Sequence, residues 1–391
     1  AEPRILVDSD VRENDSFLNR SKRGRHRAKY DHTPILPYNL CVARSVNRKE
    51  YLGVPAAMDA YWKEWNKLEQ KGVWRWEELI EWDDAVAWHN ANPSEEHGDE
   101  VHLGHLFGIM VEKGAEFDED DARRYWKYRV VFQGNQVKDQ NWEVALFNEM
   151  QSTPATLEAS RIADIYSCMT SPSGEKHSVQ TRDVEQAYLQ AEMKGPPVYV
   201  ALPKEMWTEE MHKMKCPVFP LRKALYGHKH SGVFWNEHCH EQCTKAGFIP
   251  VSEATWPCVY WNPKSNLLLI VYVDDMKLSG PPSEMEQAWK DIGQHISLEV
   301  PKGDVVSDAA EQTVTFLGCQ QTRSEKVIKG QKVQCIEYDI SKQLKRALTK
   351  YEEAVYAATG LVPEYIKAKT PFMEEDSKWS PHREPYVDED F

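Results

Sequence analysis

One apolar segment that ends in two adjacent acidic residues constrains this chain more than any other feature. Residues Leu267 to Val273 read LLLIVYV, and Asp274 and Asp275 follow directly. A short apolar run bounded by polar residues is typical of a buried strand. Met276 to Leu278 starts a return strand, which Gly280-Pro281-Pro282 closes. The pattern therefore predicts a β-hairpin with two carboxylates at its tip.

Adjacent carboxylates repel each other, and the apolar strand offers no counter-charge. A divalent cation would relieve this repulsion, and carboxylate oxygens favour Mg²⁺ or Mn²⁺. A polar β-turn without a metal is the alternative, since Asp is a favoured turn residue. Asp183 ends another predicted strand, which begins near Gln180. If these strands share a sheet, three carboxylates meet and two ions about 3.5–4 Å apart become a reasonable expectation.

Length and composition describe an ordinary globular chain. It has 391 residues, of which 41 % are hydrophobic, and its formal net charge is −14. We expect two or three packed units, or one large lobed domain. No apolar run approaches the roughly 20 residues of a membrane helix, so no membrane partner is expected. The eight scattered cysteines indicate reduced thiols and an intracellular location. A start at Ala1 without Met suggests a piece of a longer polypeptide.

Apolar periodicity predicts the remaining elements. Helices are expected at 58–68, 156–169, 234–248, 284–296 and 341–358, and strands at 102–111, 125–132 and 195–202. Thr313 to Cys319 and Lys332 to Ile336 are interpreted as a second hairpin. The tryptophan-rich stretch Trp74 to Trp88 is interpreted as core rather than as a base-stacking surface.

Three charged or polar stretches have open interpretations. The basic run Arg20 to Lys29 is either a nucleic-acid arm, a nuclear signal or a solvated linker. The acidic loop Glu116 to Asp121 fits a solvated turn better than a calcium site, because it lacks the glycine and distal glutamate of an EF-hand. A soft-ligand cluster would suit zinc, but its spacing is irregular and we favour helix-surface and core residues. The cluster comprises His228, His230, His238, Cys239, His240 and Cys243.

A set of short motifs occurs in a characteristic order. They are Trp126 to Gly134, Asp183 to Leu189, Leu225-Tyr226-Gly227-His228-Lys229 with Trp235, Gly247-Phe248, Tyr272-Val273-Asp274-Asp275, Phe316-Leu317-Gly318 and Thr370-Pro371. From about Ala43 to Pro371, the chain resembles the reverse transcriptase of copia-type long-terminal-repeat retrotransposons.

This resemblance implies an α+β, right-hand polymerase fold with fingers, a palm formed by an antiparallel sheet on helices, and a partial thumb. The implied segments are a basic, disordered linker at 1–42, N-terminal helices and fingers at 43–175, a palm with a primer-grip-like hairpin at 176–336, a thumb-like helix and connection at 337–372, and an acidic tail at 373–391. The implied activity is RNA-directed DNA polymerase, a nucleotidyltransferase within a Pol polyprotein.

The resemblance also implies residue roles. Asp183, Asp274 and Asp275 would be catalytic metal ligands, with the Val184 carbonyl completing one shell of two Mg²⁺ or Mn²⁺ ions. Tyr188 would reject a ribose 2′-hydroxyl, although core packing is the alternative for this ring. The remaining roles are nucleotide binding for Lys127, Arg129, Tyr226 and Gly227, and primer grip for Phe316, Leu317 and Gly318.

The implied partners are an RNA or DNA template-primer, deoxynucleoside triphosphates, and flanking integrase and RNase H domains of the polyprotein. The implied location is the cytoplasm, with the nucleus as an alternative. Some residues depart from the family pattern, notably His228-Lys229-His230 after the Leu-Tyr-Gly turn and Gln133 before the finger glycine. A decayed or repurposed reverse-transcriptase fold that binds nucleic acid or protein without polymerising therefore remains an alternative.

Overall fold

The computed structural model describes residues 43–115, 120–145, 154–300 and 312–363. The expectations for residues 1–42, for most of the acidic loop, for Thr370-Pro371 and for the tail fall outside this part of the chain. The described residues up to Lys345 belong to one compact unit. Helix α8, Ser341–Thr359, begins in that unit and confirms the predicted helix at 341–358. Among the described helices, none has the length and apolar character needed to cross a membrane.

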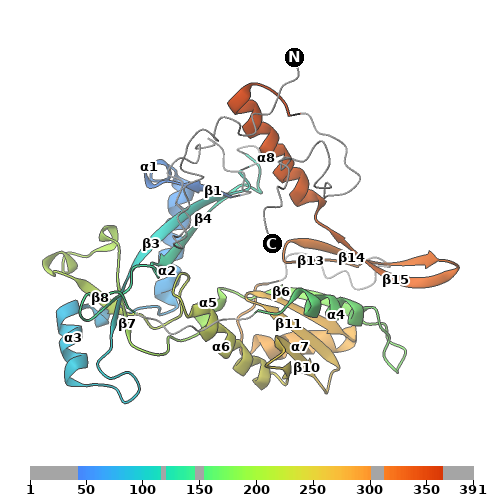
Figure 1. The fold of residues 1–391 in the computed structure, drawn as a ribbon, viewed down its shortest axis with the longest axis horizontal. Helices are drawn as coiled ribbons and strands as arrows, with labels where there is room; N and C mark the ends of the chain where they lie inside the picture. Colours follow the sequence, from blue (N-terminus) through green and yellow to red (C-terminus); the bar gives the residue numbers. More distant parts are fainter. Residues whose placement is uncertain (1–42, 116–119, 146–153, 301–311, 364–391) are drawn as a thin grey trace, which may run out of the picture. The chain divides into compact units, whose positions relative to one another are not determined.

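The first sheet is built around the long strand β3, His102–Lys113 (Figure 1). Its strand order is β1-β3-β7-β8-β2, and β4 and β5 also pair with β3. All these pairs are antiparallel except β3 with β7. The other strands are β1 Ala43–Val46, β2 Ile80–Glu81, β4 Tyr125–Phe132, β5 Lys138–Asp139, β7 Val198–Ala201 and β8 Pro217–Pro220.

Helix α2, Pro55–Gln70, packs on β4 through an aromatic cluster. The Tyr61 ring lies 4.7 Å from Tyr128 and 6.2 Å from Trp65. Trp74 and Trp82 are buried, which confirms the core interpretation for these two residues, whereas Trp88 is exposed. On α2, Trp65 is buried and Trp62 is exposed. The smaller helices of this region are α1 Arg48–Tyr51, η1 Trp76–Glu78, α3 Trp82–Ala91, η2 Lys204–Met206 and η3 Met211–Lys213.

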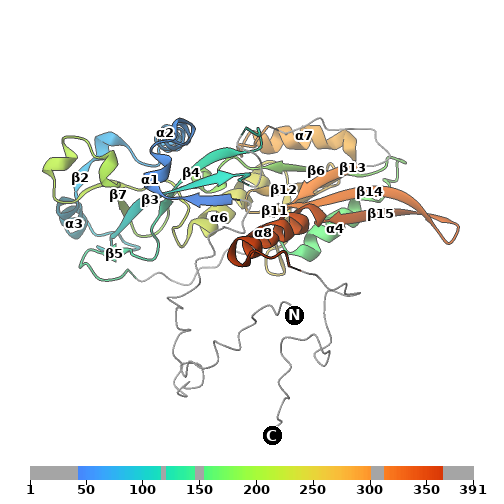
Figure 2. The ribbon, with the colours of Figure 1, turned by 90° about the horizontal axis from the view of Figure 1, so that it is seen from above.

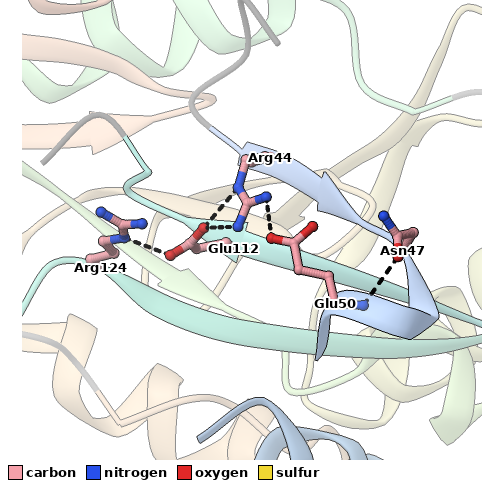
Figure 3. Close-up of polar contacts among 5 residues, drawn as sticks. All are labelled: Arg44, Asn47, Glu50, Glu112 and Arg124. Atoms are coloured by element: carbon pink, nitrogen blue, oxygen red, sulfur yellow. Dashed lines mark hydrogen bonds and ion pairs between the residues drawn. The ribbon is translucent and has the colours of Figure 1, made fainter. Parts of the chain in front are cut away.

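A buried carboxylate fastens β1 to β3 at the end of the first sheet (Figure 3). Glu112 on β3 accepts hydrogen bonds from Arg44 Nη2 at 2.7 Å and Arg124 Nε at 2.5 Å. Burial alone would raise the pKa of Glu112, but the bonds from Arg124 and Arg44 outweigh it and lower that pKa. Arg44 also reaches Glu50, and the Asn47 side chain caps α1 by accepting from the Glu50 amide.

The second sheet has five antiparallel strands in the order β6-β12-β11-β10-β9. The central strand β11 (Leu267–Tyr272) and its neighbour β12 (Asp275–Gly280) are the predicted hairpin, which is thereby confirmed. The other strands are β6 Ser178–Asp183, β9 Ile249–Ser252 and β10 Trp256–Asn262.

Helices cover both faces of this second sheet. Helices α6 (Ser231–Lys245) and α7 (Pro282–Gly293) bury Trp235 and Trp289 against one face. Helix α4, Leu157–Ser167, packs its alanines against Val259, Leu268 and Ile270 on the opposite face. The predicted helices at 156–169, 234–248 and 284–296 are confirmed, and Gly247 has the positive φ of 88° that suits its place after α6.

The third sheet has the order β13-β14-β15, with strands Gln312–Phe316, Cys319–Ile328 and Gln331–Asp339. The prediction that Thr313–Cys319 pairs with Lys332–Ile336 is wrong, because β14 lies between the two segments and pairs with both. Residues 320–328 read QQTRSEKVI and lack apolar alternation, so backbone pairing rather than a buried face defines this strand.

Sheet membership does not follow the order of the chain. Strand β6 belongs to the second sheet, β7 and β8 belong to the first, and β9 to β12 complete the second. A short helix, α5 (Ala187–Gln190), lies between β6 of the second sheet and β7 of the first sheet. The division into fingers at 43–175 and palm at 176–336 therefore stays a prediction. Figure 2 shows α4 beside β14 and β15, where a hydrogen bond from Tyr338 to Asp164 joins them.

The end of β4 approaches the backbone of Gly227 closely, so a side chain at this position should destabilise the protein. The φ of Gly227 is +94°, and a Cβ there would lie 2.1 Å from the Phe132 carbonyl oxygen. Gly174 has a similar φ of +87°, but a Cβ there would meet nothing within 4 Å, so this position isolates the cost of the backbone conformation. We expect Gly227→Ala to lower the free energy of unfolding by ~1–3 kcal/mol more than Gly174→Ala, the usual cost of overpacking. Urea denaturation measures both, and equal losses would contradict the close approach.

Candidate active site

The two adjacent aspartates occupy a tight turn. Strand β11 ends at Tyr272 and β12 begins at Asp275, so Val273 and Asp274 form a two-residue loop. Val273 has a φ of +56°. A β-branched residue rarely adopts this left-handed conformation, and such strain typically costs about 1–3 kcal/mol. Surrounding contacts must therefore hold the turn in place.

Helix α6 supplies one of these contacts from the opposite face of the sheet. The indole Nε1 of Trp235 donates a hydrogen bond of 2.8 Å to the Val273 carbonyl. Trp235 is fully buried among the residues that line α6, α7 and the sheet. A rigid, packed donor of this kind orients the peptide next to Asp274, so Trp235 helps to position the aspartates.

Strand β6 brings the third carboxylate to the turn. Asp183 lies directly opposite Asp275 in the antiparallel register of β6 and β12. The Val184 amide donates to the Asp274 carbonyl at 2.6 Å, and the Glu299 amide donates to the Asp183 carbonyl at 2.8 Å. The backbone of Asp183 is thus held between β12 and the segment after α7, and all three predicted aspartates come together.

Electrostatic repulsion marks this cluster. Burial raises the pKa of Asp275 to about 6, with further contributions from Asp274 and Asp183. Asp183 and Asp274 are exposed, whereas Asp275 is half-buried. In the described part of the chain, no three His, Cys, Asp or Glu side chains form a preformed metal cage, and this includes the aspartates. Clustered carboxylates with a raised pKa nevertheless have the donor chemistry of a site for hard divalent cations.

Two tyrosines and an arginine lie next to the aspartates and contact one another in sequence. The rings of Tyr188 and Tyr226 lie 5.0 Å apart, and the Arg129 guanidinium lies 5.3 Å from the Tyr226 ring centroid. Burial raises the pKa of Tyr188, and the charge of Asp274 adds to this shift. The structure thus brings Arg129, Tyr226 and Tyr188 into one group next to Asp274.

The other predicted nucleotide-binding residues flank this group. Exposed and buried residues alternate along this part of β4. Lys127 and Arg129 are exposed, and Tyr128 and Val130 are buried. The Phe132 amide donates to the Tyr226 carbonyl at 2.7 Å, which joins the end of β4 to the turn that contains Gly227.

The predicted primer-grip residues lie at the turn between β13 and β14. Strand β13 ends at the buried Phe316, which pairs with Cys319. Leu317 and Gly318 make the two-residue connection, with φ angles of 50° and 74°. Two positive φ angles are typical of a type I′ hairpin turn. The exposed tip of this turn is Leu317, and the primer-grip role of the three residues stays a prediction.

Sequence reasoning missed several residues that position this site. The Gln190 side chain donates to the Glu185 carbonyl at 2.7 Å and accepts from the Ser297 amide at 2.9 Å, so it clamps the chain after Asp183. Glu185 also forms an ion pair with Lys67 on α2, at 3.1 Å. No local pattern predicts these contacts. Trp235 carried a signal, because it belongs to the motif that begins at Leu225.

The histidine and cysteine cluster does not converge. Cys239 and Cys243 contact each other at 3.8 Å within the core of the second sheet. The His228 ring packs 5.1 Å from Phe132, and the His240 ring lies 6.0 Å from Tyr260. The cluster thus breaks up into local contacts, such as that between the His228 and His230 rings at 5.9 Å, and among the described residues it forms no group of three that could hold a metal.

The fold and the site together define a class of protein. The chain combines helices with antiparallel sheets, and its candidate site is a hairpin that carries carboxylates. Residues 115–337, more than half of the chain, match the family model for "Reverse transcriptase (RNA-dependent DNA polymerase)". The chain belongs to this reverse transcriptase family, and its mixed architecture is consistent with such a domain.

The raised pKa of Asp275 generates a pH prediction for the metal-free protein. Asp in an unfolded chain titrates near about 3.9. The folded state therefore binds this proton more tightly, and its contribution to stability is lost as the pH rises through about 6. Asp275→Asn removes this dependence. In buffer with a chelator, the stability of the variant relative to the parent should grow between pH 4 and pH 7, as measured by urea denaturation. A constant or shrinking difference would show that Asp275 titrates normally.

Proposed function

We propose that this chain is the RNA-directed DNA polymerase core of a copia-type retrotransposon, which extends a primer on an RNA or DNA template. The observation that carries the proposal is the register that sets Asp183 opposite Asp275, with Asp274 in the adjoining turn. These residues lie inside the segment that matches the reverse transcriptase family. The order of the other motifs supports the copia-type assignment.

A right-hand polymerase architecture fits this proposal. The first sheet with α2 would be the fingers, and the second sheet with α4, α6 and α7 would be the palm. Helix α8 would contribute a partial thumb. The partners would be a template-primer and deoxynucleoside triphosphates, with integrase and RNase H domains elsewhere in the polyprotein. The work of such an enzyme would take place in the cytoplasm or the nucleus.

The carboxylates would form the reacting centre. Asp183 and Asp274, both exposed, would be the main ligands, with half-buried Asp275 and the Val184 carbonyl beside them. Two bound Mg²⁺ or Mn²⁺ ions would supply the positive charge that activates a primer 3′-hydroxyl and stabilises the leaving pyrophosphate. The protein contributes rigidity, since Trp235 fixes the turn and the Glu299 amide fixes Asp183.

The aromatic group next to Asp274 would select the nucleotide. Arg129, stacked near the Tyr226 ring, would present a planar fork of donors to triphosphate oxygens, with Lys127 on the same face of β4. Tyr188 packs edge-on against Tyr226, which limits its movement. Its ring would lie under the sugar and leave no space for a 2′-hydroxyl, while Gly227 would let the backbone approach the pocket.

A second candidate function is a repurposed fold that binds a partner without polymerising. It is favoured by the acidic residues around the finger cations. Glu64 on α2 and Glu299 are electrostatic neighbours of Lys127, and burial raises the pKa of Glu64. The net charge of −14 also opposes non-specific binding of a polyanion. Primer extension by the parent chain decides between the two functions.

Asp274→Asn tests the chemistry. It keeps the size and turn preference of the side chain but removes one negative charge from the cluster. We expect primer extension on poly(rA)·oligo(dT) with Mg²⁺ or Mn²⁺ to fall at least about a hundredfold, since each 1.36 kcal/mol is a factor of ten in rate. Thermal stability without metal should be kept or raised, because repulsion is relieved.

A matched control for this test is Asp59→Asn, an exposed position on α2 away from the turn, which should extend primers as the parent does. An Asp274→Asn variant with parental activity would contradict the role of the carboxylate. A parent chain without activity in either metal would favour the repurposed fold.

Tyr188 variants test the nucleotide selection. Tyr188→Val opens space under the sugar and should admit ribonucleotides, with a smaller loss for deoxynucleotides. Tyr188→Phe keeps the ring and should keep the discrimination, because the proposed gate is steric. Competition between ribo- and deoxynucleotides in primer extension measures both. Equal discrimination by the parent and Tyr188→Val would remove Tyr188 from this role.

A further inference from the structure

A buried ion pair lies beside the candidate site, on the same face of the second sheet as Asp275, and has no part in the proposed chemistry. Lys277 on β12 pairs with Asp164 on α4, and their side chains are 0 % and 2 % exposed. Lys277 Nζ also donates to Ser160 Oγ at 3.2 Å. Neighbouring positions on the same sheet face are Val259, Leu268 and Ile270, so an apolar side chain would suit the surroundings of Lys277.

Taking two charges out of water is costly, and apolar replacements of such pairs are often equally stable. Buried pairs can instead specify one arrangement of the elements that they join, because alternative arrangements leave a charge without its partner. The elements that contact the Lys277–Asp164 pair show which arrangement it would specify.

The other contacts of the pair lead to the third sheet. Lys277 Nζ donates to Gln321 Oε1 on β14 at 2.8 Å and lies 5.1 Å from the Phe316 ring centroid on β13. The Tyr338 hydroxyl on β15 donates to Asp164 Oδ2 at 2.7 Å. All three strands of the third sheet therefore contact the same ion pair.

The third sheet and the aspartates share one face of the second sheet. Side chains two residues apart on a strand point to the same face, so Lys277 shares its face with Asp275. Thr181 lies opposite Lys277, and Asp183 lies opposite Asp275. Thr181 Oγ1 also donates to the Thr315 carbonyl on β13 at 3.4 Å. The pair thus connects the strand of Asp275 to the sheet that carries the Phe316–Gly318 turn.

We propose that Lys277 and Asp164 are positioning residues that hold the third sheet, and with it the Phe316–Gly318 turn, at a fixed place beside the catalytic aspartates. The inference that the Phe316–Gly318 turn in its fixed place binds a primer end rests on the proposed polymerase function. The link between the pair and the sheet stands on the contacts alone.

The test severs the link without leaving a buried charge unpaired. The double variant Gln321→Leu/Tyr338→Phe removes the bonds from the third sheet to the pair but keeps Lys277 with Asp164. Hydrogen exchange, followed by mass spectrometry on the full chain, should show amides in 312–328 exchanging about tenfold faster, since bonds to charged groups are the strong ones. Exchange in β11 and β12 should stay at the parental rate.

The KM for template-primer and the KM for the nucleotide separate a positioning role of the pair from a purely structural one. The KM for template-primer should rise about tenfold in the double variant, matching the loss of one strong contact, while the KM for the nucleotide stays within about twofold. A matched control is Thr313→Val, which removes the 3.0 Å hydrogen bond between Thr313 and Thr322 inside the third sheet and should leave the KM for template-primer unchanged. As a second route, Lys277→Met/Asp164→Leu should reproduce the faster exchange in 312–328.

Parental exchange rates in both double variants would overturn the link between the pair and the sheet. Faster exchange with an unchanged KM for template-primer, in a chain that extends primers, would overturn the positioning role. A parent that does not extend primers contradicts the proposed function instead, and the exchange comparison still decides whether the pair holds the sheet.

Discussion

The pairing register of β6 with β12 is the constraint on which the candidate site depends. A slip of one residue would turn every side chain of β6 to the other face of the sheet. In the observed register Asp183 faces Asp275. The intervening residues point to α7, where the Trp289 indole donates to Gln180 at 2.8 Å and the Arg182 guanidinium lies 4.9 Å from the Trp289 ring. Trp289 therefore fixes the register of β6 through contacts on the face covered by α7, while Asp183 and Asp275 lie on the opposite face.

The two tryptophans beneath the sheet have complementary roles. Trp289 contacts alternate residues of β6, and Trp235 bonds to the strained turn between β11 and β12. Their helices, α6 and α7, cover the face opposite the carboxylates, so the packing that stabilises the fold also sets the geometry of the site. The carboxylates and the cluster around Trp235 and Trp289 thus lie on opposite faces of the sheet, whereas α4 packs on the same face as the carboxylates.

The sequence predicted the parts of the fold whose apolar residues follow a clear pattern. Residues 267–271 are buried on both faces of the sheet, so they form a continuous apolar run, and the helices of the second sheet bury one face each, so their periodicity was readable. Strand β14 was missed, because much of its surface is polar and its pairing is made by the backbone. The three aspartates were found from the predicted strands that they end, whereas Tyr188, Tyr226 and the other motif residues were found only through their resemblance to a family, which supplied roles but not the contacts between them.

Lys277 illustrates why some of the site could not be predicted. In the segment Met276-Lys277-Leu278, a lysine between apolar residues is normally a solvent-facing position. Its burial follows from partners that are far away along the chain, Asp164 before it and Gln321 after it. Contacts of this kind are set by tertiary structure, and no local window of sequence contains them.

The same separation along the chain has a consequence for biosynthesis. Lys277 is translated before the strands that cover it, and at about 5–20 residues per second the delay lasts on the order of several seconds. During that time α4, which is already made, gives Lys277 its partner Asp164, while the bonds to Gln321 and Tyr338 are still missing. The pair would thus form in two stages during synthesis, first between β12 and α4 and then with the third sheet, so the strands made last meet a polar contact point that is already in place on the second sheet.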